Sequence, residues 1–220
     1  MLGSMSPLPW STVGARFYET LSLEHLVYRT GREAAVGQLR LRPGDRVLDV
    51  GCGTGLSLRL LRDAVGSIGE VVGVDASAAM LARASRLIEA QGWTNVTVLR
   101  GDASLLSGVV ARGRCFDACL FAYSLSVVPD WEAAWRQAVG LLAPKTRVAV
   151  VDSTLPSGRW RVLAPLVRLE CLIGGVDAER HPWETVLSST HDTSHLVLRG
   201  GHVHLAAGTL PPFGGHDPPT

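Results

Sequence analysis

Three acidic residues and one glycine-rich segment have the types and spacing of a ligand site. The acids are Asp49, Asp75 and Asp102, and each lies at or just after the end of a short apolar run. Residues 51–55, with the sequence GCGTG, directly follow the run that contains the first acid. Carboxylates accept hydrogen bonds from hydroxyl and amino groups, and glycines let a ligand approach the backbone closely. The pattern therefore predicts a binding site for a ligand that carries such groups.

The elements that must position these residues alternate along the chain. Apolar runs expected to be strands alternate with stretches of helical periodicity, of which one has Ser77 as its N-cap and ends at Gly92 and another begins at Asp130. This order is typical of an α/β, Rossmann-like parallel sheet with helices on both faces. The expected strands are 46–50, 70–75, 96–99, 116–123 and 147–152, and the first expected helix is 56–65.

The last part of the chain has a different pattern. Residues 193–199 and 202–209 are separated only by Gly200 and Gly201, which predicts a tight hairpin. The parallel sheet is therefore expected to finish with a terminal antiparallel β-hairpin.

One domain is expected over residues 10–210, since 220 residues with 46% hydrophobic side chains suffice for one core. Within it, 10–41 is expected to form a helical cap, with 16–21 and 29–39 as its best helices. The cofactor-binding core is expected over 42–153, and a C-terminal helix and the hairpin over 154–210. Residues 1–9 are interpreted as a disordered tail or cloning remnant, and 211–220 as a flexible tail.

Charge and composition exclude several function classes. Lys plus Arg number 21 and Asp plus Glu 20, so the net charge of +1 disfavours nucleic-acid binding. We find no metal-type spacing among the four cysteines, and Cys115 and Cys119 are expected to pack in the core. His202 and His204 are interpreted as strand histidines rather than metal ligands. No apolar run is long enough to span a bilayer, and no leader is evident, so a cytoplasmic protein is expected.

Parallel strands bring their carboxyl ends to one edge of a sheet, where open α/β sheets bind ligands. Asp75 lies about 20 residues beyond the glycine segment, the distance at which an acid meets ribose hydroxyls in nucleotide-binding sheets. Asp102 is positioned to accept a hydrogen bond from an exocyclic amine such as that of adenine. The alternative is purely structural: Asp75 would precede a capped helix, and Asp102 would cap a helix that begins near Ser104.

These residues, together with 72–77, Met80 and Leu81, 101–103 and 141–144, resemble the class I S-adenosylmethionine-dependent methyltransferases. The resemblance covers roughly residues 10–210, but Pro144-Lys145-Thr146 departs from the family's usual Pro-Gly-Gly. It implies S-adenosylmethionine as cofactor, with the glycine segment at its amino-acid part, Asp75 at the ribose and Asp102 at the adenine amine. The cofactor residues implied are Tyr18, Tyr28, Arg32, Asp49, Gly51, Cys52, Gly53, Gly55, Asp75, Ala76, Met80, Asp102, Ala103, Ala122, Tyr123 and Ser124.

Within the family, the segments 18–32 and 123–131 look like methyltransferases that act on lipid head-group amines, such as diacylglyceryl-homoserine or phosphatidylethanolamine. This narrower resemblance implies a small-molecule or lipid acceptor and peripheral contact with a membrane, for which Arg159, Trp160, Arg161 and Arg168 are candidates. The alternative acceptors are a quinone or another small metabolite, methylated at carbon or oxygen.

Methyl transfer from a sulfonium needs mainly alignment and exclusion of water, so no catalytic base is obligatory. Tyr123, Asp130 or a nearby histidine could act as a base, although Asp130 is also a natural helix N-cap. Two other functions are considered: an NAD-dependent oxidoreductase and a noncatalytic cofactor-binding protein. The first fits less well, because Leu56 stands where the third glycine of the dinucleotide fingerprint would be.

Overall fold

The computed structural model describes residues 28–110 and 115–212, without the side chains of 163, 169, 170 and 172–174. The predicted tail 1–9, the predicted helix 16–21 and residues 213–220 lie outside the described residues. The strands are β1 (Arg46–Val50), β2 (Glu70–Asp75), β3 (Val96–Arg100), β4 (Phe116–Ala122), β5 (Leu142–Ser153), β6 (His191–Leu198) and β7 (Val203–Thr209). The helices are α2 (Tyr28–Gln38), α3 (Leu58–Val65), α4 (Ala78–Gln91), α5 (Leu106–Val109), α6 (Trp131–Val139), α7 (Ala164–Gly174) and α8 (Trp183–Ser189), with short 3₁₀ turns η1 (Ala103–Leu105), η2 (Gly158–Leu163) and η3 (Arg199–Gly201).

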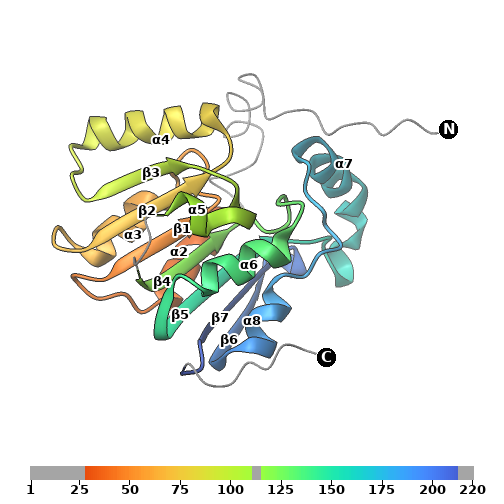
Figure 1. Cartoon of the computed structure of the whole chain (residues 1–220). Helices are drawn as coiled ribbons and strands as arrows, with labels where there is room; N and C mark the ends of the chain where they lie inside the picture. Colours follow the sequence, from red (N-terminus) through yellow and green to blue (C-terminus); the bar gives the residue numbers. More distant parts are fainter. Residues whose placement is uncertain (1–27, 111–114, 213–220) are drawn as a thin grey trace.

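One seven-stranded sheet organises the molecule, in the order β3-β2-β1-β4-β5-β7-β6 (Figure 1). The first five strands in this order are parallel, and β7 pairs antiparallel with both β5 and β6. Helices cover both faces, with α2, α3 and α4 on one face and α5, α6 and α8 on the other. The predicted α/β fold with terminal antiparallel strands is confirmed.

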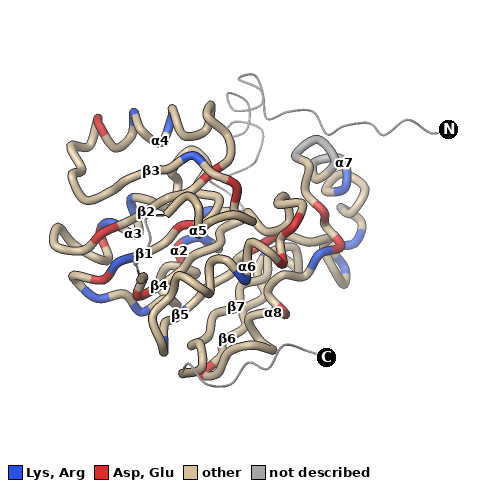
Figure 2. The backbone as a smooth tube through the Cα atoms, viewed as in Figure 1, with Lys and Arg blue, Asp and Glu red and all other residues tan. Residues whose placement is uncertain are grey.

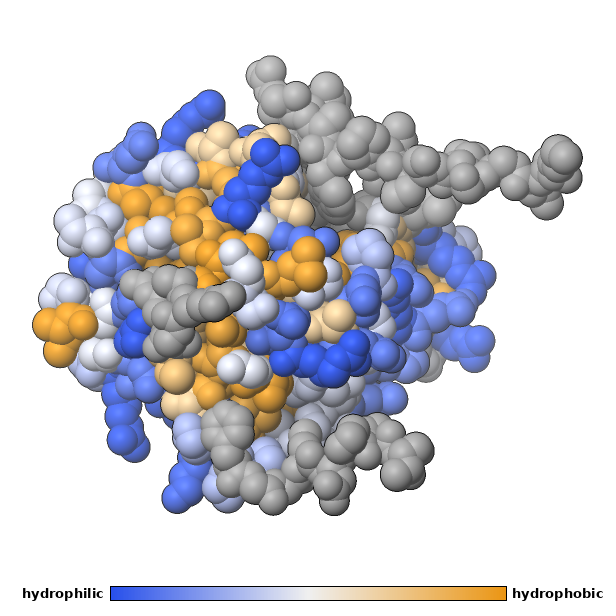
Figure 3. All heavy atoms as spheres, in the orientation of Figure 1, coloured by the Kyte–Doolittle hydropathy of each residue, from blue (hydrophilic) through white to orange (hydrophobic). Residues whose placement is uncertain are grey.

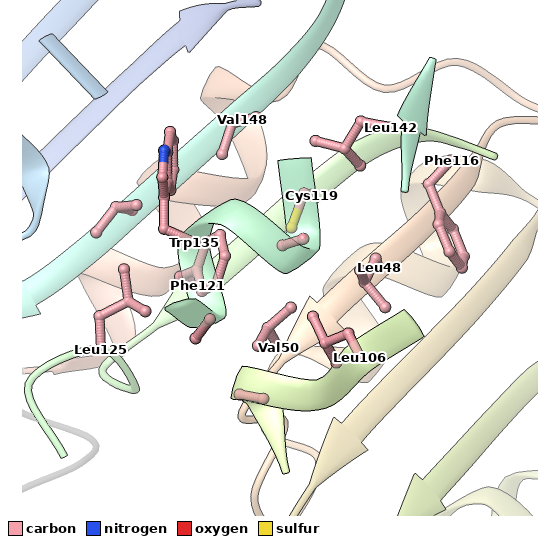
Figure 4. Packing of buried hydrophobic residues seen from close by; sticks show 14 of the residues in the cluster. Leu48, Val50, Leu106, Phe116, Cys119, Phe121, Leu125, Trp135, Leu142 and Val148 are labelled. Atoms are coloured by element: carbon pink, nitrogen blue, oxygen red, sulfur yellow. The ribbon is translucent and has the colours of Figure 1, made fainter. Parts of the chain in front are cut away.

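The two faces of the sheet bury separate apolar clusters, because successive side chains of a strand point to opposite faces. In β1, Leu48 and Val50 face the cluster under α5 and α6, and Val47 faces the cluster under α3. Figure 4 shows Phe121 and Trp135 side by side in the first cluster, and their ring centroids are 5.8 Å apart. Both faces of the central strands are thus buried, and the edge formed by the strand ends is left to carry polar groups.

Local helix signals act as the sequence predicts. The Ser77 side chain caps α4 by accepting a hydrogen bond from the Met80 N–H, and Gly92 ends that helix in the left-handed conformation. Both features fix where α4 begins after β2. They hold the residues that follow Asp75 in a defined turn at the strand end.

Three local predictions were wrong. The connection between β6 and β7 is a 3₁₀ turn over 199–201 followed by His202, not a two-residue turn, and Arg199 joins the two glycines at positive φ. Tyr123 leaves strand β4, because its φ is +57°. Cys115 is exposed, whereas a core position was expected for it. In the first two cases backbone conformation near a strand end, rather than apolar periodicity, determines the local structure.

Candidate active site

The carboxyl ends of the parallel strands meet at one edge of the sheet, as predicted. The Gly51 N–H donates to the Val74 carbonyl at 2.8 Å, and the Gly101 N–H donates to the Asp75 carbonyl at 3.0 Å. On the other side, the Tyr123 N–H donates to the Val151 carbonyl at 2.8 Å. These backbone bonds join the segments that follow β1, β2, β3 and β4 into one continuous rim.

The glycine segment has the backbone freedom that the sequence predicts. Gly51, Gly53 and Gly55 have φ values of +75°, +56° and +90°, which favour glycine. A Cβ on Gly51 would collide with the Ser124 side chain, and one on Gly55 would lie 2.9 Å from Leu58 Cδ1. A Cβ on Gly53 would meet no described atom within 4 Å. The loop is thus packed on both sides, and its middle glycine faces open space.

Asp75 links the glycine loop to the start of α4. Its Oδ2 accepts a hydrogen bond from the Gly53 N–H at 2.9 Å, and its Oδ1 accepts one from the Ser77 N–H at 2.8 Å. Burial raises the pKa of Asp75 above its ordinary value, and these two N–H groups oppose that rise. Each carboxylate oxygen has a second lone pair, so the group can also accept bonds from a vicinal diol.

Asp49 is fully buried beneath the loop. Neither of its carboxylate oxygens has a hydrogen-bond partner among residues 28–110 and 115–212. Burial raises the pKa of Asp49 to about 7, while the charge of Arg32 lowers it and that of Asp75 raises it. An unpartnered buried carboxyl is costly, and at a strand end it indicates a ligand site. Cys52 is buried beside it, and burial raises the pKa of its thiol.

Asp102 and its neighbours lie at the end of β3. Asp102 caps η1, because its Oδ1 accepts bonds from the Ser104 N–H at 2.8 Å and the Ser104 hydroxyl at 2.7 Å. Asp102 therefore caps a helical turn, as the structural alternative predicts. An exposed carboxylate can cap such a turn and bind a ligand at the same time. Ala103 and Met80 are buried, and Ala76 is exposed. Figure 3 shows an apolar area around α5, where Leu105 is 63% exposed.

Aromatic residues close the other side of the rim. The Tyr123 hydroxyl donates to the Tyr28 carbonyl at 3.0 Å, and the two rings meet edge to face with centroids 4.9 Å apart. The Arg32 guanidinium lies over the Tyr123 ring, 5.2 Å from its centroid. The close approach depends on Gly31, where a Cβ would overlap the Tyr123 hydroxyl. Helix α2 is thereby held against the end of β4.

Ser124, Ala122 and Asp130 complete the predicted set on this side. Ser124 is 3% exposed, and its Oγ has no partner within the described part of the chain. Ala122 ends β4, next to Val151 of β5. Asp130 is exposed, and its Oδ1 caps α6 by accepting a bond from the Ala133 N–H at 3.0 Å. Tyr18, the remaining candidate, lies outside the described residues.

Two buried polar residues at the rim were not assigned to the site from sequence. Asp152, near the end of β5, accepts bonds from the Ser126 hydroxyl at 2.7 Å and the Ser126 N–H at 3.0 Å. Burial raises the pKa of Asp152 to about 6 against these hydrogen bonds. His202 is 7% exposed and bonds the Tyr28 hydroxyl. The sequence predicted a strand position for His202, but the residue lies just before β7 in the turn that follows the glycine pair.

Comparison with known proteins agrees with this geometry. Residues 47–145 match a family model described as a methyltransferase domain. The chain is 36% identical over 148 residues to a 2-phytyl-1,4-naphtoquinone methyltransferase of Synechococcus elongatus, covering 64% of this chain and 61% of that protein. It is 28% identical over 130 residues to a demethylmenaquinone methyltransferase of Shouchella clausii, covering 59% and 54%. The chain thus spans less than two thirds of the length of these curated relatives.

Solved structures share the fold. A SAM dependent methyltransferase from Aquifex aeolicus superposes with a TM-score of 0.61 at 17% identity, over 91% of this chain and 98% of that one. The YcgJ protein of Bacillus subtilis gives 0.62 at 19% identity, over 83% and 98%. At these identities the likeness concerns the fold.

Residues 47–145 therefore match a methyltransferase-domain family, and the fold is the one seen in solved SAM dependent methyltransferases. The predicted fold is confirmed, and the family match agrees with the predicted methyltransferase class. The relatives named above methylate quinones by their descriptions, so the narrower resemblance to lipid head-group enzymes gains no support.

Two further features bear on partners. Across the described residues, no helix combines the length and apolar character needed to cross a bilayer, and no three His, Cys, Asp or Glu side chains are grouped to hold a metal ion. Figure 2 shows acidic and basic residues interspersed along the backbone of the described residues.

Proposed function

We propose that this chain transfers a methyl group from S-adenosylmethionine to a reduced quinone or a related small hydroxylated aromatic compound. When bound, the cofactor supplies a methyl group already activated on a sulfonium sulfur. The remaining task of the protein is to bind the cofactor, align the acceptor and keep water away from the reacting atoms.

The single observation that carries the proposal is the set of unsatisfied groups around the glycine loop. Asp49 and Ser124 are buried without hydrogen-bond partners within the described residues. Gly53 faces open space, and its backbone nitrogen lies 2.9 Å from Asp75 Oδ2. A nucleoside with an amino-acid chain matches this donor set, because it brings a diol, an amine, an ammonium and a carboxylate. Asp75 would bind the ribose, and Asp49 beneath the loop would favour the ammonium end electrostatically.

The aromatic pair suits a planar acceptor. Tyr28 and Tyr123 present ring edges and faces at the rim, where Arg32 adds a positive charge over one ring. Such a surface favours flat aromatic compounds and their developing negative charge. The descriptions of the naphthoquinone and menaquinone relatives support the same acceptor class. A head-group amine, the first expectation from sequence, lacks such support.

Transfer of tritium from methyl-labelled S-adenosylmethionine tests the proposal. The acceptors are a 2-prenyl-1,4-naphthoquinol kept reduced in detergent, phosphatidylethanolamine in the same detergent, and a water-soluble dihydroxynaphthalene. Label in the naphthoquinol supports the proposal, and Asp75→Ala is expected to reduce it. Label in phosphatidylethanolamine alone would restore the head-group assignment, and no label in any aromatic acceptor would contradict the proposal.

A further inference from the structure

A buried histidine that the cofactor site does not use stands behind one of its aromatic residues. His202 lies between η3 and β7, and its backbone carbonyl accepts a bond from the Thr154 N–H at 2.8 Å, just after β5. Its ring Nδ1 contacts the Thr154 carbonyl, and its Nε2 lies 3.1 Å from the Tyr28 hydroxyl. Three segments distant in sequence therefore converge on one imidazole.

The partners determine the protonation of the neutral ring. A carbonyl oxygen only accepts hydrogen bonds, so Nδ1 must carry the proton that points at Thr154. Nε2 is then an acceptor, and the Tyr28 hydroxyl must donate to it. This order leaves the lone pairs of the Tyr28 oxygen directed away from the histidine.

Tyr28 is in position to use those lone pairs at the acceptor side of the rim. Its ring contacts that of Tyr123, and Tyr123 is followed by Ser124, which packs against Gly51. The pair thus lies on the same edge of the sheet as the glycine loop. Charged groups on the surrounding elements include Arg29, Arg32 and Glu33 of α2; Asp152, two residues before Thr154; and Arg199, which bonds Thr30 at 3.2 Å.

We propose that Tyr28 is the catalytic base for the acceptor hydroxyl, and that His202 positions the Tyr28 hydroxyl and accepts its proton. This inference rests on the proposed function. The hydroxyl proton of the acceptor passes to Tyr28 Oη, while the Tyr28 proton passes to His202 Nε2. The electron pair released on the acceptor forms the new bond to the methyl carbon, and the carbon–sulfur bond breaks with its pair on sulfur. The resulting imidazolium returns its proton to water.

Histidine ring NMR of the ¹⁵N-labelled protein tests the hydrogen-bond order without any acceptor. The expected result is the Nδ1–H tautomer at His202, with an Nε2 resonance that moves in Tyr28→Phe. An Nε2–H tautomer at His202 would overturn the proposal. Because this readout is independent of turnover, it distinguishes failure of the relay from failure of the proposed function, which would show as an inactive wild-type protein.

Kinetics with the naphthoquinol acceptor test the role. Tyr28→Phe and His202→Gln are expected to lower kcat about 100-fold, the usual scale of base catalysis. The control is His195→Gln, a histidine of β6 whose Nε2 lies 3.1 Å from His204 Nδ1. Full activity in Tyr28→Phe or in His202→Gln would overturn the proposal.

Discussion

The rim at the carboxyl ends of the strands has two halves. The hydrogen bonds within these halves join residues at very different separations along the sequence. In the cofactor half, formed by Asp49, Asp75, Asp102 and residues 51–55, Asp75 bonds Ser77, 2 positions away, and Gly53, 22 positions away. In the cap half, formed by Tyr28, Tyr123 and His202, the Tyr28–His202 bond spans 174 positions. The first half therefore depends on turns and on the pairing of neighbouring strands, and the second on how distant elements pack.

That difference explains what the sequence could reveal. The strand order, the loop glycines and the Ser77 cap follow from short patterns, because spacing and turn chemistry determine them. The partners of His202 could not be found this way, since β6 and β7 insert beside β5 only in the folded sheet. Tyr123 was placed in a strand, because a tyrosine at the end of an apolar run carries no sequence signal for its φ of +57°.

The largest expected effect comes from the contact that joins the two halves. Gly51→Ala should destabilise the protein by roughly 2 to 5 kcal/mol, because the residue has a positive φ and its new Cβ would collide with Ser124. Urea denaturation measures the change. Gly37→Ala is the matched control, because a Cβ there meets no described atom within 4 Å and should leave stability equal or higher. Equal free energies of unfolding for Gly51→Ala and wild type would show that this contact does not join the two halves.

Within the cofactor half, Asp75→Ala should weaken binding of S-adenosylhomocysteine by roughly 1.5 to 3 kcal/mol, the scale for hydrogen bonds to a charged group. Calorimetric titration measures the dissociation constant. Asp63→Ala, an exposed acid of α3, serves as control and should bind like wild type. A dissociation constant unaltered by loss of Asp75 would mean that the ribose lies elsewhere.

The buried acid should make stability depend on pH. The pKa of Asp49 is about 7 when folded and ordinary when unfolded, so the folded state holds its proton more tightly. The stability that this raised pKa of Asp49 contributes is therefore fully present at low pH, and it is lost as the pH rises from about 4 to 7. When the pH rises from 5 to 8, the free energy of unfolding of Asp49→Asn should increase relative to that of wild type by on the order of 2 kcal/mol. Parallel unfolding curves at the two pH values would contradict this assignment.

The smallest effect concerns the outer boundary of the cap half. Asp130→Ala removes the α6 cap and should cost about 1 kcal/mol of stability while leaving turnover within twofold of wild type. Thermal unfolding and the tritium assay measure the two quantities. Asp130→Ser should restore the lost stability, because serine also caps helices. A large loss of turnover in Asp130→Ser would return Asp130 to the catalytic candidates.

The central claim is that the cofactor half holds one adenosyl group, and a crystal structure with S-adenosylhomocysteine tests it most directly. We predict both ribose hydroxyls within hydrogen-bond distance of Asp75, the adenine beside Asp102 and Ala103, and the sulfur directed toward Tyr28 and Tyr123. A nucleoside bound on any other surface, with Asp49 and Ser124 still unpartnered, would contradict it.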